Sequence, residues 1–360
     1  MVVATDRRSY SGATAPRVGV VGAGGLGVHH VRILRDLAGD RFAGFVDENP
    51  ARATEVAAQL GVRALPSLDA LLAEVDAVSV VVPTTAHHRV ATAALRAGKH
   101  VFIEKPFTVT LAEADDLIAQ AHAAGVVLQV GHVERFNRAV RAAMPFVDGP
   151  RFIESDRLAP FNPRGSDVAV VLDLMIHDLD LVHTLVGSPV ADVQAMGIPV
   201  LTPQLDIANA RLTFANGAVA NITASRVSRE RVRKLRIFQQ SGYLSLDLAA
   251  GTGEFFRLRA DFDPRQLARA PRALEDFVER VTLDAPDGEP LELELSQFLG
   301  AVMGTRAVAV TGAEGRDALE AALRIVTAIE AAHATMLSNA AADAAAKAAA
   351  RKTITPPTRA

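Results

Sequence analysis

Cysteine is absent from the 360 residues of this chain. Its absence excludes disulfides, thiolate catalysis and zinc or iron–sulfur centres held by cysteine. Long uncharged apolar runs of the kind that cross a bilayer are also missing. The first 16 residues have no apolar core of the signal-peptide type. We therefore expect a cytoplasmic protein that does not bind membranes.

A strong excess of either charge is lacking as well. The net charge is −3 and the isoelectric point is near 6.4, which gives no general attraction to nucleic acid. Hydrophobic residues make up 49% of the chain and charged residues 22%, a balance typical of folded soluble proteins. Because 360 residues exceed what one hydrophobic core usually holds, we expect two domains.

Strands and helices alternate through the first third of the chain. Apolar strand patterns end near Val21, Asp47, Pro83, Glu104 and His132, and an amphipathic helix pattern separates each strand from the next. The run 75–83 (VDAVSVVVP) is predominantly apolar, as in a strand buried on both faces of a parallel sheet. Residues 17–132 are therefore predicted to form a doubly wound α/β domain of the Rossmann type.

The pattern changes after residue 132. Alternating strand patterns fill 209–226, with a hairpin turn signal at Asn216-Gly217, and 234–248. Helical patterns follow over 291–304 and 315–333. We predict an α+β domain with a predominantly antiparallel sheet over 133–337. Residues 1–16 are expected to be a flexible leader, and 338–360 an Ala-rich tail without chemistry.

The cofactor site is predicted from a glycine motif at the first strand–helix junction. In G-x-G-x-x-G, Gly22 permits a tight turn, Gly24 lets a pyrophosphate approach, and Gly27 lets the helix pack on the strand. Gly25 and Leu26 complete the loop. Asp47 ends the second strand 20 residues after Gly27, where a carboxylate binds ribose hydroxyls and repels a 2′-phosphate. NAD is therefore expected rather than NADP.

Further cofactor contacts are expected where the later strands end, because ligands gather at the carboxyl ends of parallel strands. These candidates are Pro83, Thr84, His87, Glu104 and Lys105. No metal site is predicted, since the adjacent histidine pairs 29–30 and 87–88 point in different directions and have no carboxylate partner at ligand spacing.

Lysine is scarce: it occupies only positions 99, 105, 234, 347 and 352, whereas arginine is used almost everywhere else. A lysine kept at position 105, at the end of a buried strand, suggests a function that arginine cannot perform. Its ammonium is a compact charge that can change protonation in a desolvated site.

The stretch LDLMIHDLD (172–180) has the periodicity of an apolar helix with a narrow polar stripe. On a regular α-helix, Asp173, His177 and Asp180 fall within an arc of about 60°. Such groups are costly to bury unless they are paired or face a wet cavity. We expect the stripe to face a cleft between the domains.

The EKP sequence at 104–106, followed by D-x-x-x-H-x-x-D at 173–180, resembles the glucose–fructose oxidoreductase/inositol dehydrogenase/MocA (Gfo/Idh/MocA) family from about residue 17 to 335. The resemblance implies an active-site set of Lys105, Asp173 and His177, with Asp180 touching substrate. It does not decide which of Lys105 and His177 is the base. It also implies a dimer or tetramer formed through the second sheet. Many members have Gly before the histidine, where this chain has Ile176.

Stretches such as VGHVERFN and APFNPRGSDVAVVLDLMIHD are similar to the UDP-N-acetylglucosamine 3-dehydrogenases of that family. Those enzymes make the 3-keto sugar that is later aminated to a 2,3-diamino sugar for lipid A. The implied reaction is NAD-dependent oxidation of the C3 hydroxyl. Arg135 and Arg164 are candidates to bind the diphosphate. The basic run 225–236 could contact the diphosphate from a neighbouring loop or subunit, or it could be a solvated hairpin connection, and it is not placed in the site. The alternatives are a free-sugar or inositol dehydrogenase and a non-catalytic dinucleotide-binding regulator.

Overall fold

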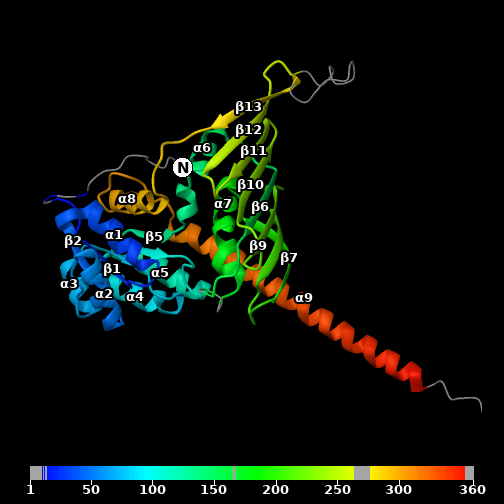
Figure 1. Cartoon of the computed structure of the whole chain (residues 1–360), viewed down its shortest axis with the longest axis horizontal. Helices are drawn as coiled ribbons and strands as arrows, with labels where there is room; N and C mark the ends of the chain where they lie inside the picture. The colour runs from blue at the N-terminus through cyan, green and yellow to red at the C-terminus, as the bar shows by residue number, and fades with distance from the viewer. Residues whose placement is uncertain are drawn as a thin grey trace, which may run out of the picture.

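The computed structural model describes residues 10, 12, 14–163, 165, 168–262 and 276–352, with side chains as far as residue 336. Two sheets stand side by side, and a long C-terminal helix runs along both (Figure 1). Within these residues, no helix combines the length and apolarity needed to cross a membrane.

The N-terminal domain is a five-stranded parallel sheet in the order β2-β1-β3-β4-β5. This confirms the predicted doubly wound α/β fold. Its strands are β1 (Val18–Val21), β2 (Phe42–Val46), β3 (Ala77–Val80), β4 (His100–Glu104) and β5 (Leu128–Gly131). Its helices are α1 (Gly27–Ala38), α2 (Pro50–Leu60), α3 (Leu68–Glu74), α4 (Thr84–Arg96) and α5 (Leu111–Ala124).

Helix α3 was not predicted from the sequence, although its N-terminal signal is present. The Ser67 hydroxyl caps the helix by accepting from the backbone N–H of Ala70 at 3.1 Å. The helix has only 7 residues, so its hydrophobic repeat is too short to separate it from a loop.

The C-terminal domain contains an eight-stranded sheet in the order β13-β12-β11-β10-β6-β9-β8-β7. Neighbouring strands are antiparallel except β6 and β9, which run parallel, so the predicted mostly antiparallel sheet is confirmed. The strands are β6 (Phe152–Leu158), β7 (Val190–Ile198), β8 (Ile207–Phe214), β9 (Val219–Ser225), β10 (Val232–Gln239), β11 (Gly242–Asp247), β12 (Thr252–Leu258) and β13 (Val278–Leu283).

Helices cover one face of this sheet. They are α6 (Arg138–Ala143) and α7 (Ile176–Val186), and α7 is preceded by a π-helical turn, η4 (Val171–Met175). Met175, Ile176 and Leu179 share a buried core with the inward side chains of the sheet, such as Ile153 and Leu235. This packing places α7 against the inner face of β6 and β9 in the middle of the sheet.

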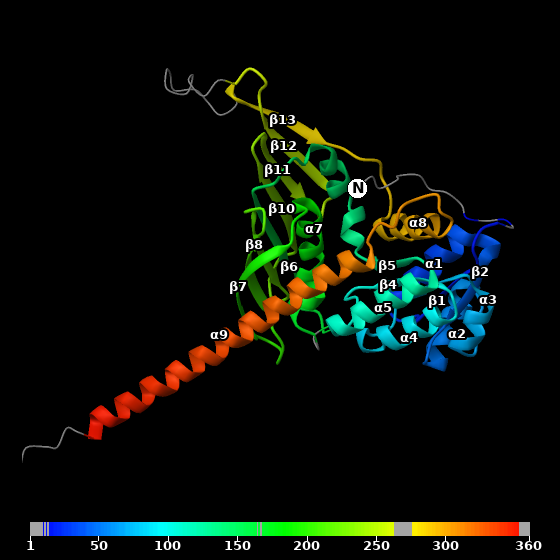
Figure 2. The same cartoon turned by 180° about the vertical axis from the view of Figure 1, so that it is seen from behind.

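Two late helices join the domains. In α8 (Pro290–Val302), Leu295 and Phe298 lie in the same core as β1 and α1. Helix α9 (Gly312–Lys352) contacts α5, α7 and β7 in turn (Figure 2). Tyr10 falls in the part assigned to a flexible leader, but it is buried and donates a hydrogen bond to the Ser296 carbonyl at 2.6 Å.

Candidate active site

The glycine loop between β1 and α1 has the geometry that a dinucleotide requires. Gly22 adopts a φ of 94°, and a Cβ there would lie 2.5 Å from the Val81 carbonyl oxygen. A Cβ at Gly27 would lie 2.1 Å from the Gly22 oxygen. A Cβ at Gly24 would meet nothing within 4 Å. Packing therefore requires Gly22 and Gly27, whereas the open side of Gly24 leaves room for a phosphate at the start of α1.

A cavity of about 650 Å³ lies beside this loop, and Gly22, Gly24, Asp47 and Pro83 are among its lining residues. The Asp47 carboxylate is held in place because it accepts the backbone N–H of Ala23 at 2.7 Å and that of Asn49 at 2.8 Å. The glycine loop, the cavity and this fixed carboxylate together fit the adenosine half of NAD.

Two arginines border the same cavity region. Arg52 donates from Nε to the Ala23 carbonyl at 2.9 Å, and Arg89 pairs with Glu48 at 3.0 Å. Each cation has its own partner, and Asp47 remains at the cavity wall. The arrangement keeps a negative group where a 2′-phosphate would bind, with cations close by.

His87 and Glu104, expected to touch the cofactor, are instead buried. The His87 ring lies within 3.2 Å of the carbonyl oxygens of Val82, Pro106 and Phe107, so it ties the ends of β3 and β4 together. Glu104 contacts His30 Nε2 at 3.1 Å. Burial alone would raise the pKa of Glu104, but the hydrogen bond from His30 and the nearby charges lower it. Both side chains hold the β4 end that carries Lys105 in place.

Lys105 connects the two domains. Its Nζ donates to the Asp173 backbone oxygen at 2.7 Å and lies 3.4 Å from Asp173 Oδ1. The side chains are 17% and 33% exposed respectively, so both are shielded yet reachable by a small molecule. The two predicted catalytic positions, 68 residues apart in the chain, therefore meet where the domains face each other.

The helix carrying Asp173 departs from the regular geometry assumed for the sequence. Residues 171–175 form a π-helical turn, and the α-helix begins only at Ile176. A π turn contains more residues than an α turn, so the 3.6-residue spacing does not carry across it. Such turns often occur at functional sites.

His177 lies immediately after this turn and is partly buried. Its Nδ1 has no hydrogen-bond partner within the described part of the chain. Burial, followed by the positive charges of Lys105 and Arg157, holds the pKa of His177 well below its ordinary value. The imidazole is therefore neutral near neutral pH and able to accept a proton.

Asp180 and Arg135, both expected to bind substrate, are each only 1% exposed. Arg135 donates two hydrogen bonds to Asp180, at 2.8 and 2.6 Å, and another to Glu314 at 2.7 Å. This buried ion pair fixes α7 to the segment after β5. A contact of either residue with substrate stays a prediction. Arg164 lies outside the described residues.

A second buried ion network beside His177 was missed by the sequence analysis. Arg157 bonds Asp178 at 2.6 Å and Glu134 at 2.8 Å, and Ser155 donates to Asp178 at 2.9 Å. Burial alone would lower the pKa of Arg157, but the two carboxylates raise it. One signal was present: Arg157 occupies an inward position in the alternating pattern of 152–158.

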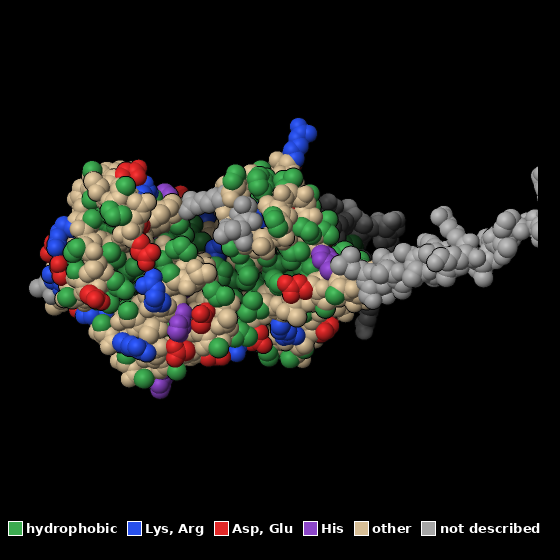
Figure 3. Space-filling model, turned by 90° about the horizontal axis from the view of Figure 1, so that it is seen from below, with side chains coloured by type: hydrophobic (Ala, Val, Ile, Leu, Met, Phe, Trp, Pro, Cys, Tyr) green, Lys and Arg blue, Asp and Glu red, His purple; other side chains and the backbone are tan. Residues whose placement is uncertain are grey.

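On the face seen from below, hydrophobic side chains gather where the two domains meet, and most charged side chains lie farther out (Figure 3). Within the described ranges, no group of three or more His, Cys, Asp and Glu residues is arranged to hold a metal ion.

Comparison with protein families gives two matches. Residues 16–132 match the oxidoreductase family with an NAD-binding Rossmann fold, GFO_IDH_MocA, and residues 138–245 match the GFO/IDH/MocA C-terminal domain. The first match covers the parallel sheet, and the second covers β6 to β10 with part of β11, together with Asp173 and His177.

Among individual proteins, the chain is 44% identical over 316 residues to UDP-N-acetylglucosamine 3-dehydrogenase of Acidithiobacillus ferrooxidans, covering 88% of this chain and 97% of that protein. It is 28% identical to myo-inositol 2-dehydrogenase of Thermotoga maritima over 322 residues, covering 84% and 93%.

A solved structure of the Acidithiobacillus enzyme superposes with a TM-score of 0.81, covering 88% of this chain and 98% of that one. Levoglucosan dehydrogenase, solved with NADH and levoglucosan, superposes with a TM-score of 0.74 at 18% identity, covering 87% and 96%. The second likeness concerns the fold alone.

Proposed function

Because the chain belongs to the Gfo/Idh/MocA family of oxidoreductases, we propose that it oxidises a secondary hydroxyl of a nucleotide-activated sugar with NAD. The substrate in this proposal is UDP-N-acetylglucosamine, oxidised at C3 to the 3-keto sugar. The observation that carries it is the meeting of Lys105 and Asp173 beside a neutral His177. The 44% identity over 88% of the chain supports the choice of substrate.

In this proposal His177 accepts the hydroxyl proton, because its imidazole is neutral at working pH. Lys105 donates a hydrogen bond to the same oxygen and stabilises the charge that develops on it. Asp173 holds the ammonium of Lys105 through its backbone and side-chain oxygens. NAD, when bound, supplies the hydride acceptor.

A substrate panel tests the proposal. The purified protein is incubated with NAD and, in turn, UDP-N-acetylglucosamine, UDP-glucose, N-acetylglucosamine and myo-inositol, and the absorbance of reduced nicotinamide is followed. The spectrum of the protein as isolated is recorded first, in case the coenzyme co-purifies. We expect turnover with UDP-N-acetylglucosamine and much less with free sugars. Comparable rates with myo-inositol would instead make it an inositol dehydrogenase, the function of the Thermotoga relative.

NAD, rather than NADP, is the proposed cofactor, and Asp47 is proposed to determine the preference. Replacing Asp47 with Ser removes the negative charge but leaves Arg52 and Arg89 nearby. We expect the ratio of kcat/KM for NAD to that for NADP to fall by about 10- to 100-fold, as one lost charge–charge interaction would produce. Initial rates with each coenzyme measure this.

The same substitution at Asp69, in the first turn of α3, is the control and should leave the ratio unchanged. An Asp47→Ser enzyme with the native preference would show that another residue excludes NADP.

We further propose that the chain forms a homo-oligomer through the outer face of the eight-stranded sheet. Phe152, Phe238, Tyr243 and Phe256 form a row across four strands on that face, with ring centroids 4.7 to 5.6 Å apart. Each is only partly buried, and exposed aromatic rows of this kind favour association.

A further inference from the structure

The basic run at 225–236 divides between the two faces of the sheet. Along β10, Leu235 and Ile237 are buried on the inner face, so Arg233 projects from the same side. Lys234 and Arg236 alternate onto the outer face, where Arg236 pairs with Glu154 at 2.9 Å. A sequence stretch that resembles a solvated charge run therefore sends one arginine toward the start of α7.

Arg233 lies directly opposite Arg157 in the antiparallel pairing of β10 with β6. The guanidinium nitrogens of Arg157 all donate hydrogen bonds to Asp178 and Glu134. The Arg233 guanidinium approaches Glu134 Oε1 at 3.4 Å, and Arg157 already donates to the same oxygen at 2.8 Å. The Arg233 side chain is 37% exposed, so its guanidinium lies between the buried network and solvent.

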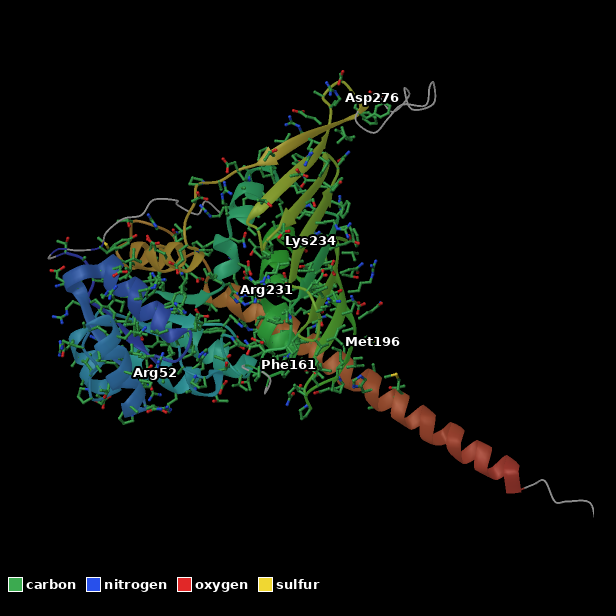
Figure 4. The ribbon with its side chains drawn as sticks, in the orientation of Figure 1. Arg52, Phe161, Met196, Arg231, Lys234 and Asp276 are labelled. Atoms are coloured by element: carbon green, nitrogen blue, oxygen red, sulfur yellow. The ribbon has the colours of Figure 1, made fainter. Side chains whose placement is uncertain are left out.

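Positive charge exceeds negative charge at this point. Arg157, Arg231 and Arg233 face Glu134 and Asp178, which leaves three cations against two carboxylates, or +1. Figure 4 shows Arg231 where the two domains meet, whereas Lys234 lies farther up the sheet. Burial and then the charge of Arg157 lower the pKa of Arg233. Like charges on directly opposed strand residues are destabilising, so the pair is costly without an anion.

This excess positive charge acts on His177, the proposed base. Arg233 and Arg157 are two of the cations, with Lys105, that lower the pKa of His177. Arg157, which lies directly opposite Arg233, also bonds Asp178, the residue next to His177, so a ligand oxidised beside His177 lies near Arg233. A sugar nucleotide carries its diphosphate one bond from the sugar ring, within reach of a second cation in the same site.

We propose that Arg233 binds the diphosphate of the sugar nucleotide and thereby selects UDP-linked over free sugars. The inference rests on the proposed function. The planar guanidinium forms two parallel hydrogen bonds to phosphate oxygens, which a point charge cannot reproduce. Its weak contact with Glu134 leaves those donors available. Arg233 thus takes the role that the sequence had given to Arg135 and Arg164.

The test compares Arg233→Gln and Arg233→Lys with Arg236→Gln as a matched control, which removes a cation from the same strand on the opposite face. Binding of UDP and of uridine is measured by calorimetry with NADH present, and KM is measured for UDP-N-acetylglucosamine. For Arg233→Gln we expect the Kd for UDP and the KM to rise about 10- to 100-fold, from loss of charge-assisted hydrogen bonds. Arg233→Lys should recover part of the loss. Arg236→Gln should stay within about twofold, and uridine affinity should not change.

The pH profile gives a second measurement that a purely structural role would not change. Removing the Arg233 charge raises the pKa of His177. The acid limb of kcat should therefore move to higher pH in Arg233→Gln and stay in place in Arg236→Gln. Native UDP affinity in Arg233→Gln, or a native protein that does not bind UDP, would overturn the inference. If the native protein binds UDP through Arg233 but oxidises a different UDP-sugar, the inference stands and the substrate proposal fails.

Discussion

Replacing Lys105 with Met, or His177 with Ala, is expected to lower kcat by about 10²- to 10⁴-fold, the usual contribution of a positioned acid or base. Affinity for NAD should stay within a few-fold of native, because the glycine loop and Asp47 lie apart from both side chains. Single-turnover rates measure the first quantity, and fluorescence titration with NADH measures the second.

Matched controls are available for both variants. Lys99→Met removes a lysine just before the opposite end of β4, and His122→Ala removes an exposed histidine from α5. Both should keep native rates. Near-native turnover in Lys105→Met and His177→Ala together would favour the non-catalytic regulator and end the enzymatic proposal.

The pH dependence follows from the same cause. The pKa of His177 is lowered by burial and by the charge of Lys105, so the neutral base persists well below pH 6.5 and kcat falls only at more acidic pH. In Lys105→Met one of those charges is gone. The pKa of His177 then rises, and the acid limb of the residual activity should move to higher pH.

Asp180→Ala is expected to lower the free energy of unfolding by about 3–5 kcal/mol, because it leaves the buried guanidinium of Arg135 without its main partner. The thermal midpoint should drop by at least roughly 5 °C. Thermal denaturation followed by circular dichroism measures the change. In kinetic assays the substitution should mainly reduce the amount of folded, active enzyme, and KM should stay close to native.

The control for this prediction is Asp284→Ala, which breaks the exposed pair with Arg138 at 2.6 Å. Exposed pairs contribute about 0–1 kcal/mol, so its midpoint should hardly move. A stable Asp180→Ala protein with a strongly raised KM would instead restore Asp180 as the substrate contact implied by the family resemblance.

Lys105 and Asp180 differ in what the sequence could show about them. Lys105 was singled out from its place at the end of a buried strand and from the rarity of lysine, both of which are local features. The 3.6-residue repeat that groups Asp180 with His177 holds, because both residues lie within the regular helix α7, whereas the π turn at 171–175 changes only the spacing from Asp173. The repeat could not show that Asp180 pairs with Arg135, which comes from a distant segment of the chain.

The sequence by itself determined the alternation of strands and helices in the first third of the chain, the dinucleotide loop at Gly22, Gly24 and Gly27, and the kinds of group that the chemistry needs. These depend on periodicity and on steric rules acting over a few residues. Only the tertiary structure decided which charges are already neutralised. It paired Arg135 with Asp180 and Arg157 with Asp178, and it left Arg233 with a shared, weak contact beside His177. The partner of a buried charge comes from a distant part of the chain, so no local pattern can identify it.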